Sequence, residues 1–340
     1  MRLLVLAGGV GLGLSGCGAD AAGSSPVGGD DAGTSEPDAP GNPNDPSDAP
    51  TSEQVTPLAQ DSPGIDMMAT DATHLYWAVN WLFSSAVRRM PLGGGPIETL
   101  YAGSGGHVTF AVEGDSVYIG QTRSFPDNFM GSILRVPVTG GSPTTIASVY
   151  KLGRIDVVDG LIYYREGVGE SESRIMRVPT TGGQPHFIVS ARRSTSPADL
   201  DVDTGFVFYV DQYSIMRAEA KTKKVLELTS SLPTEITVDD AHVYFVACAV
   251  SECPTASVYR VPRGGGTAEP LAPSVATGHY HQAKLAVIDD DLQWGARVLP
   301  KAGGPARVLH DTPSPSAVAA TPQAFYFAEF YTGVIYRAAR

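Results

Sequence analysis

The sequence predicts an all-β fold, a β-propeller of about seven four-stranded blades, and three observations carry that prediction. One strand pattern recurs from about residue 65 to the C-terminus, helical periodicity is absent, and the last copy of the pattern stops one strand short. Each copy runs from an apolar strand through an Asp-containing turn to an apolar-aromatic strand, an Arg-containing strand, a Gly-Gly turn and a short apolar strand. Four-strand repeats of about 40 residues are typical of propeller blades.

Each segment of the repeat has the residue chemistry of strands and tight turns. Short runs of Val, Ile, Tyr and Phe are bounded by Asp, Gly and Pro, as is typical of strands. The Gly-Gly pairs supply the positive φ that a tight hairpin needs. The second-strand aromatic residue is expected at Tyr76, Tyr118, Tyr163, Phe208, Tyr244, Trp294 and Tyr326. The third-strand arginine is expected at Arg89, Arg135, Arg177, Arg217, Arg260 and Arg337, and the abbreviated sixth copy lacks it.

The strand missing from the last copy is expected at the other end of the chain. The final copy supplies three strands, at about 316–320, 325–327 and 334–338, and then ends. The segment Val55–Ala59 (VTPLA) matches Ala268–Ala272 (AEPLA), which is the fourth strand of the fifth copy. We therefore expect the N-terminal strand to complete the last blade and close the ring, which removes the open sheet edges of a repeat array. Six or eight blades remain alternatives because the sixth copy is short.

The N-terminus predicts export and a lipid anchor. After Arg2, an apolar run extends from Leu3 to Leu14, which is too short to span a bilayer as a permanent helix and is typical of a signal peptide. It ends in Leu-Ser-Gly-Cys17, which resembles the lipobox of bacterial lipoproteins. The resemblance implies a signal peptide over residues 1–16 and a lipid on the Cys17 thiol; an ordinary secretory signal with an incidental cysteine is the alternative. Gly18 stands where an inner-membrane retention signal has Asp, so we expect the cell envelope, at the outer membrane or cell surface.

Residues 17–53 are expected to form a disordered acidic linker ahead of a propeller at 54–340. From residue 18 to 53 there is no aromatic residue, Lys or Arg, and eight acids there account for most of the net charge of −12. Such a segment cannot bury enough apolar surface to offset its ordering entropy. The acidic balance, without a visible basic stripe, argues against nucleic acid as a partner. We expect a monomer that meets the membrane only through its lipid.

The other two cysteines, Cys248 and Cys253, are expected to form a disulfide. An even pair on a short loop outside the cytosol is most simply a disulfide; a metal site is the alternative, but no His lies beside the pair at ligand spacing. We expect no metal and no cofactor. The sequence contains no Gly-x-Ser-x-Gly, phosphate loop, Cys-x-x-Cys or nucleotide fingerprint.

The loops of a propeller divide between two faces, and one of them is expected to bind a ligand. The first-to-second and third-to-fourth turns are short and regular, whereas the second-to-third hairpins and the links between blades are long and irregular. Variable loops on a rigid scaffold are where binding residues usually lie, and exposed aromatic residues often mark recognition surfaces. The candidates on this face are Trp81, Phe83, Phe125, Phe129, His107, Tyr280 and Tyr331. The alternative is that the aromatic residues pack on neighbouring blades.

His279 and His281 are the best chemical fragment in the chain. Two imidazoles at i and i+2 could bind a metal or act as acid and base, with Glu170, Glu252 or His107 as a partner, but without a located third ligand the signal is weak. The run Asp289–Asp291 is expected to be an ordinary turn, because Asp favours turn geometry. The recurrent Arg and Tyr residues are expected to pack and hydrogen-bond between blades.

The repeat also resembles known propellers. The segments Leu75-Tyr-Trp, Val87-Arg-Arg and Gly93-Gly resemble the YWTD repeats of extracellular propellers and, more closely, the repeat propellers of secreted bacterial lipoproteins. Ala78 and Val79 replace the Thr-Asp of that motif, so the resemblance implies a fold and a secreted context without a ligand. We expect a protein- or glycan-binding or scaffold module at the envelope. The alternatives are a propeller lyase or hydrolase using His279 and His281 with a carboxylate, and a structural surface protein without a ligand.

Overall fold

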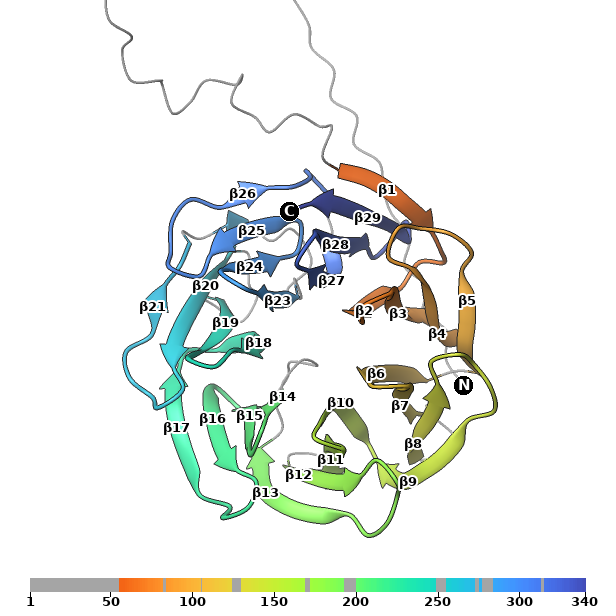
Figure 1. Ribbon diagram of the computed structural model, residues 1–340. Helices are drawn as coiled ribbons and strands as arrows, with labels where there is room; N and C mark the ends of the chain where they lie inside the picture. Colours follow the sequence, from red (N-terminus) through yellow and green to blue (C-terminus); the bar gives the residue numbers. More distant parts are fainter. Residues whose placement is uncertain are drawn as a thin grey trace, which may run out of the picture. The chain divides into compact units, whose positions relative to one another are not determined.

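The computed structural model is an all-β propeller whose described residues form seven antiparallel sheets arranged in a ring (Figure 1). This confirms the fold class and the blade number expected from the repeat. The structure describes residues 55–81, 84–104, 106–123, 130–168, 172–192, 200–248, 255–272, 275–276, 284–312 and 315–340. No helix among them is long and apolar enough to cross a membrane.

The blades follow one another in chain order. Blade 1 is β2 (Ile65–Thr70), β3 (His74–Trp81), β4 (Ser84–Pro91) and β5 (Glu98–Ser104). Blade 2 is β6 (His107–Glu113), β7 (Ser116–Thr122), β8 (Met130–Pro137) and β9 (Thr144–Tyr150). Blade 3 is β10 (Leu152–Val158), β11 (Leu161–Val168), β12 (Glu172–Pro179) and β13 (His186–Arg192). Blade 4 is β14 (Leu200–Asp203), β15 (Phe206–Asp211), β16 (Ser214–Glu219) and β17 (Val225–Ser230).

The last three blades depart from this regular pattern. Blade 5 is β18 (Pro233–Val238), β19 (His242–Cys248) and β20 (Thr255–Pro262), with two short outer pieces, β21 (Glu269–Pro270) and β22 (Val275–Ala276), both paired with β20. Blade 6 is β23 (Leu285–Ile288), β24 (Asp291–Trp294), β25 (Arg297–Pro300) and β26 (Arg307–Val308). Blade 7 is β27 (Pro315–Thr321), β28 (Ala324–Glu329), β29 (Val334–Ala339) and the N-terminal strand β1 (Val55–Gln60).

The N-terminal strand closes the ring, as the sequence predicts. In Figure 1, β1 runs along the outer side of β29. The two strands pair antiparallel, from Val55 opposite Ala338 to Gln60 opposite Val334, with a bulge between Pro57 and Ala59. A bulge at this point fits the chemistry of proline, which has no N–H to give to the ladder.

The core consists of seven apolar clusters, one at each junction between neighbouring blades among the described residues. At the junction of blades 7 and 1, Tyr326 packs with Leu75 and Trp77, and all three are almost fully buried. Fully burying such a side chain stabilises a fold by about 1.5–3 kcal/mol. Because side chains of a strand alternate between its two faces, each second strand supplies residues to both of its junctions, and the innermost strands lie side by side around the axis.

The sixth blade corrects one detail of the predicted repeat. In the other blades the second-strand aromatic lies opposite the third-strand Arg, as in Tyr76 opposite Arg89. In blade 6 the corresponding residue two places into β24 is Gln293, opposite Val298. Placing Trp294 in this position was therefore wrong by one residue, and the shift moves the Trp ring to the junction with blade 5. Gln293 is fully buried, and its Nε2 donates to Tyr326 O of blade 7 at 2.9 Å.

In the well-matched blades, the Asp in the turn before the second strand accepts hydrogen bonds from that turn and from the strand. Asp71 Oδ1 accepts the N–H groups of Thr73 and His74 at 2.7 Å each, and Asp71 Oδ2 accepts the Tyr76 hydroxyl at 2.6 Å. Burial and the bond to Asp71 raise the pKa of that hydroxyl to about 12. The same bonds recur between Asp239 and Tyr244 in blade 5. Asp and Tyr are therefore repeated because they form one turn motif.

Candidate functional site

Strand direction assigns every loop to one of two faces. Because neighbouring strands are antiparallel, the first-to-second and third-to-fourth turns lie at one end of each blade, which we call the turn face. The second-to-third loops and the links between blades lie at the other end, the loop-rich face. The Gly-Gly turns of the turn face have the expected positive φ, with 84° at Gly140 and 135° at Gly141.

Three of the predicted ligand-face residues are described, and all three lie on the loop-rich face. Trp81 is the last residue of β3, His107 is the first residue of β6, and Tyr331 lies in the loop between β28 and β29. Cys248 is the last residue of β19. The other predicted site residues lie outside the described residues: Cys17, Phe83, Phe125, Phe129, Glu170, Cys253, His279, Tyr280 and His281.

Trp81 and Tyr331 belong to one aromatic cluster that spans blades 7 and 1. The Trp81 ring lies 5.8 Å from the Phe330 ring, and Phe330 meets Tyr331 edge-on at 5.3 Å. Such geometries are favourable because the positive edge of one ring faces the negative face of another. Trp81 is half-buried against the junction between the two blades, whereas Tyr331 is 46% exposed. The cluster therefore presents one ring to solvent on a packed base.

His107, the first residue of blade 2, lies near the end of β3 that carries Trp81, because its neighbour Val108 is hydrogen-bonded to Asn80. Its Nε2 is 3.1 Å from Asp66 Oδ2, and its side chain is 59% exposed. The Asn80 amide donates to Asp66 Oδ1 at 2.8 Å and to Val108 O at 2.9 Å, and its Oδ1 accepts the Val108 N–H. This network joins blades 1 and 2 and holds an exposed imidazole in place.

Two further apolar pairs are exposed on the loop-rich face. Met130, at the start of β8, lies opposite Tyr150, at the end of β9, and these side chains are 49% and 38% exposed. Tyr213 and Leu232, in blade 4 and the link that follows it, are 54% and 41% exposed, and the Leu232 N–H donates to Tyr213 O. The remaining large apolar residues that are exposed in the described part of the chain lie on or beside outer strands: Ile97, Phe187, Val225 and Val308.

The centre of the ring holds a charged cluster that the sequence reasoning missed. Glu235 of β18 is 2% exposed. Its Oε1 is 3.3 Å from Arg154 Nη1 of β10, and its Oε2 is 3.0 Å from Lys284 Nζ, just before β23. These contacts connect blades 3, 5 and 6. A buried carboxylate needs such partners, because an unpaired ion in a protein interior is costly.

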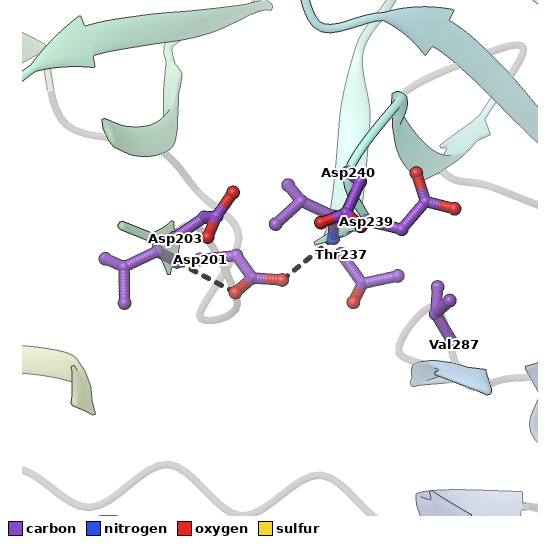
Figure 2. Close-up of a pocket in the computed structure, with 8 residues that line it drawn as sticks. Asp201, Asp203, Thr237, Asp239, Asp240 and Val287 are labelled. Atoms are coloured by element: carbon purple, nitrogen blue, oxygen red, sulfur yellow. Dashed lines mark hydrogen bonds between the residues drawn. The ribbon is translucent and has the colours of Figure 1, made fainter. Parts of the chain in front are cut away.

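A pair of carboxyl groups lies beside this triad. Asp156 of β10 and Asp201 of β14 are joined by a side-chain hydrogen bond. Burial raises the pKa of Asp156, and burial together with the neighbouring Asp156 charge raises the pKa of Asp201 to about 7. Asp201 of β14 accepts the Val202 N–H at one carboxyl oxygen and the Val238 N–H of β18 at the other, and Figure 2 marks both bonds with dashed lines.

Asp201 also lines a cavity of about 250 Å³ at the turn face. The wall includes Asp203, Thr237, Asp239, Asp240 and Val287 (Figure 2). Two of these acids are already paired, Asp203 with Arg263 at 2.6 Å and Asp239 with Lys301 at 2.5 Å. Burial raises the pKa of Asp239, but the Lys301 bond and the turn N–H bonds outweigh burial and lower that pKa to about 2. Within the described residues, no group of three or more His, Cys, Asp or Glu residues is placed to hold a metal ion.

The other acidic and basic motifs of the sequence have structural partners. Asp289 and Asp291 flank the turn between β23 and β24, and both pair with Arg340. Of the recurrent arginines, Arg260 donates to Lys301 O of the next blade at 2.8 Å, and Arg217 donates to Arg263 O of the next blade at 2.6 Å. These two bonds confirm the expected role between blades, whereas Arg89 bonds to Glu98 and Arg135 bonds to Ser116 within their own blades.

A signal for the missed cluster is present in the sequence. Charged residues occupy alternate positions in the innermost strands, as at Arg154 and Asp156, at Asp201 and Asp203, and at Glu235 next to Thr237. Period-two placement puts such residues on one side of a strand. A charge on the strand nearest the axis in three successive blades predicts a polar centre.

Known structures share the fold, although neither a family model nor a curated protein sequence matches the chain. BamB from Moraxella catarrhalis is 12% identical with a TM-score of 0.52, over 84% of this chain and 96% of that one. The WD40 repeats of RRP9 are 11% identical with a TM-score of 0.59, over 86% and 98%. An oligogalacturonate lyase from Vibrio parahaemolyticus is 13% identical with a TM-score of 0.56, over 84% and 93%. These identities show the fold alone, so the chain is a seven-bladed β-propeller, an architecture that hosts many different functions.

Proposed function

We propose that this propeller is a non-catalytic binding or scaffold module of the cell envelope that recognises a protein or glycan through its loop-rich face. One observation carries the proposal. Exposed apolar side chains gather at this face in three places: Met130 with Tyr150, Tyr213 with Leu232, and Tyr331 on the Phe330–Trp81 base. Aromatic residues and Met are enriched where proteins bind partners, because they bury large areas with few rotatable bonds.

The scaffold supports this use of the face. Seven apolar junctions hold the blades, and Phe330, which itself packs on Trp81, contacts the Tyr331 ring edge-on. Ordering a side chain on binding costs about 0.5–1.5 kcal/mol, so a ring that is already packed can bind with a smaller loss of entropy. Polar groups such as His107 and Asp66 lie beside the aromatic cluster and can provide directional hydrogen bonds.

The proposal includes attachment to the envelope through the N-terminus. The Leu-Ser-Gly-Cys17 motif, the apolar run before it and the acidic linker after it support lipidation of Cys17. A multiply acylated cysteine is a stable anchor, because each buried methylene contributes about 0.8 kcal/mol. The linker would attach the membrane to β1, the strand that closes the ring. Metabolic labelling with a radioactive fatty acid tests this step: the wild type should be labelled and Cys17→Ser should not, and equal labelling of both would contradict it.

Photo-crosslinking on intact cells tests the binding face. A photoreactive phenylalanine analogue replaces Tyr331 or Tyr213 in the full-length protein, and the matched control replaces Val225, which is 39% exposed on the outer strand β17. We expect discrete adducts from the two loop-rich positions and none from Val225. An adduct that a glycosidase shortens contains a glycan partner. An adduct whose protease digest yields peptides of a second protein contains a protein partner. The same adducts from all three positions, or none from Tyr331 and Tyr213, would refute the proposal.

A further inference from the structure

Two carboxyl groups at the centre of the propeller are bonded to each other. Asp156 lies on β10 and Asp201 on β14, the innermost strands of blades 3 and 4. Ionised carboxylates only accept hydrogen bonds, so a bond between two carboxyl groups requires that one of them holds a proton. The contact is therefore a site for one proton, and its strength depends on whether that proton is present.

Backbone bonds make this pair part of the joint between three blades. The Val157 N–H donates to Asp156 Oδ1 at 2.8 Å, which fixes the first carboxyl on blade 3. Asp201 Oδ1 accepts the Val202 N–H at 2.8 Å, and Asp201 Oδ2 accepts the Val238 N–H of β18 at 3.0 Å. The carboxyl of Asp201 thus bridges blades 4 and 5, and its bond to Asp156 extends the bridge to blade 3.

The charges around the pair also favour one bound proton. Arg154 of β10 attracts both carboxyl groups of the pair, and Arg154 and Lys284, which lies ahead of β23, both contact Glu235 of β18. Against these two positive charges stand three carboxyl groups: Glu235, Asp156 and Asp201. The cluster is neutral when one of the three holds a proton, and it carries an excess negative charge when none does. Excess charge in a partly buried cluster is unfavourable.

Other acids near the pair have partners of their own. At the turn-face end, Arg263 pairs with Asp203 and Lys301 pairs with Asp239. Asp240 lines the same cavity as Asp201. On β6, Glu113 accepts the Gly160 N–H at 3.3 Å. Arg263 and Lys301 neutralise two of these charges, so the charge balance at the pair depends mainly on Arg154, Lys284 and Glu235.

We propose that Asp156 and Asp201 form a proton-controlled joint: one shared proton holds blades 3, 4 and 5 together at the axis, and its loss loosens them. The pKa of Asp201, raised by burial and by Asp156 to about 7, places the transition near neutral pH. This pKa lies above the ordinary value of 3.8 that applies in the unfolded chain. The stabilisation is therefore complete below pH 3.8 and is lost as the pH rises through about 7.

Hydrogen exchange of the full-length protein between pH 6 and 8 tests the joint, after correction for intrinsic exchange rates. The three N–H groups bonded to the pair, on Val157, Val202 and Val238, report its opening. Below the pKa of about 7, each pH unit should increase the opening equilibrium about tenfold, because opening releases one proton, and above that pKa the increase should level off. The amides of β28 in blade 7 should not follow this dependence. In Asp201→Asn the amide can donate to Asp156 without a proton, so the pH dependence should disappear.

A matched control and a second readout keep the test decisive. Asp240→Asn removes an acid from the same cavity wall without touching the pair, and it should behave like the wild type. Isotope-edited infrared spectroscopy of Asp-labelled protein should show a protonated carboxyl band at pH 6 that is lost by pH 8 and is absent from Asp201→Asn. Asp156→Asn serves in the same way if Asp201→Asn fails to fold. The same pH-dependent exchange in wild type and Asp→Asn variants, or no protonated carboxyl in the wild type at pH 6, would overturn the proposal.

Discussion

Replacement of Asp61 by Ala should weaken the closure of the ring. Asp61 follows β1 directly, and its carboxylate is 3% exposed. It accepts the Trp77 indole N–H at 2.6 Å and pairs with the Arg88 guanidinium, both in blade 1. Its own N–H donates to Gly333 O of blade 7 at 2.9 Å. One residue therefore connects the strand that completes blade 7 to the second and third strands of blade 1.

The expected loss of stability follows from what the substitution leaves behind. Removing one partner of a buried ion pair costs about 3–5 kcal/mol, because the other charge stays buried without compensation. The Arg88 side chain is 26% exposed, so water can solvate part of it, and we expect the lower end, about 3 kcal/mol. For a domain of this size, 1 kcal/mol changes Tm by about 2 °C. Asp61→Ala should therefore lower Tm by about 6 °C.

Urea unfolding of the full-length protein measures the loss in the free energy of unfolding, and thermal unfolding measures the shift in Tm. The control is Asp115→Ala, which removes the same side chain from an ion pair with Arg135 in which the Asp is 87% exposed; it should leave the midpoint unchanged. The double variant Asp61→Ala/Arg88→Met should recover part of the lost stability, because it also removes the unpaired charge. If Asp61→Ala is no less stable than Asp115→Ala, or if Arg88→Met adds to the loss, the buried pair does not secure the closure.

Two further substitutions test the turn and link geometry. Gly106 has φ +87°, and an added Cβ would lie 1.9 Å from Thr122 O, whereas Gly140 has a similar φ of +84° with nothing within 4 Å. Gly106→Ala should cost at least about 3 kcal/mol and Gly140→Ala about 1–2 kcal/mol in the same urea assay; equal losses would contradict this packing. Asp239 has its pKa lowered from 3.8 to about 2, so its contribution, about 2 kcal/mol, is present above pH 3.8 and is lost as the pH falls through about 2. Thermal unfolding between pH 5 and 2 should therefore be less pH-dependent in Asp239→Asn, and an unchanged slope would exclude this role.

The sequence was sufficient for the fold because each blade repeats its own local chemistry. Leu75, Tyr76 and Trp77 alternate between two junctions, and Asp71 with Tyr76 encodes the turn that follows the inner strand. The similarity of Val55–Ala59 to Ala268–Ala272 located the closing strand, although in blade 5 that segment forms only the two residues of β21, Glu269–Pro270. The error at Trp294 arose where a blade is shortest, because a shift of one residue exchanges the two faces of a strand.

The candidate site was less predictable, for a physical reason. Arg154 and Glu235 are 81 residues apart, and they meet only because the innermost strands of blades 3 and 5 both line the axis. No local pattern encodes such a contact, so neither the triad on Glu235 nor the Asp156–Asp201 pair could be assembled from motifs. The loop-rich face was predicted from loop length alone. Its exposed residues Tyr213, Leu232, Met130 and Tyr150 were not, because exposure depends on how each loop packs.

The most direct test of the account is a disulfide trap between the first and last strands of the propeller. Thr56 of β1 lies opposite Arg337 of β29, a distance that a disulfide can bridge. In the double variant Thr56→Cys/Arg337→Cys, mild oxidation followed by non-reducing peptide mapping should identify a bond between the two new cysteines. The control pair Thr56→Cys/Val308→Cys, which reaches to β26 of blade 6, should stay reduced. A bond in the control pair and none between positions 56 and 337 would contradict closure of the ring by the N-terminal strand.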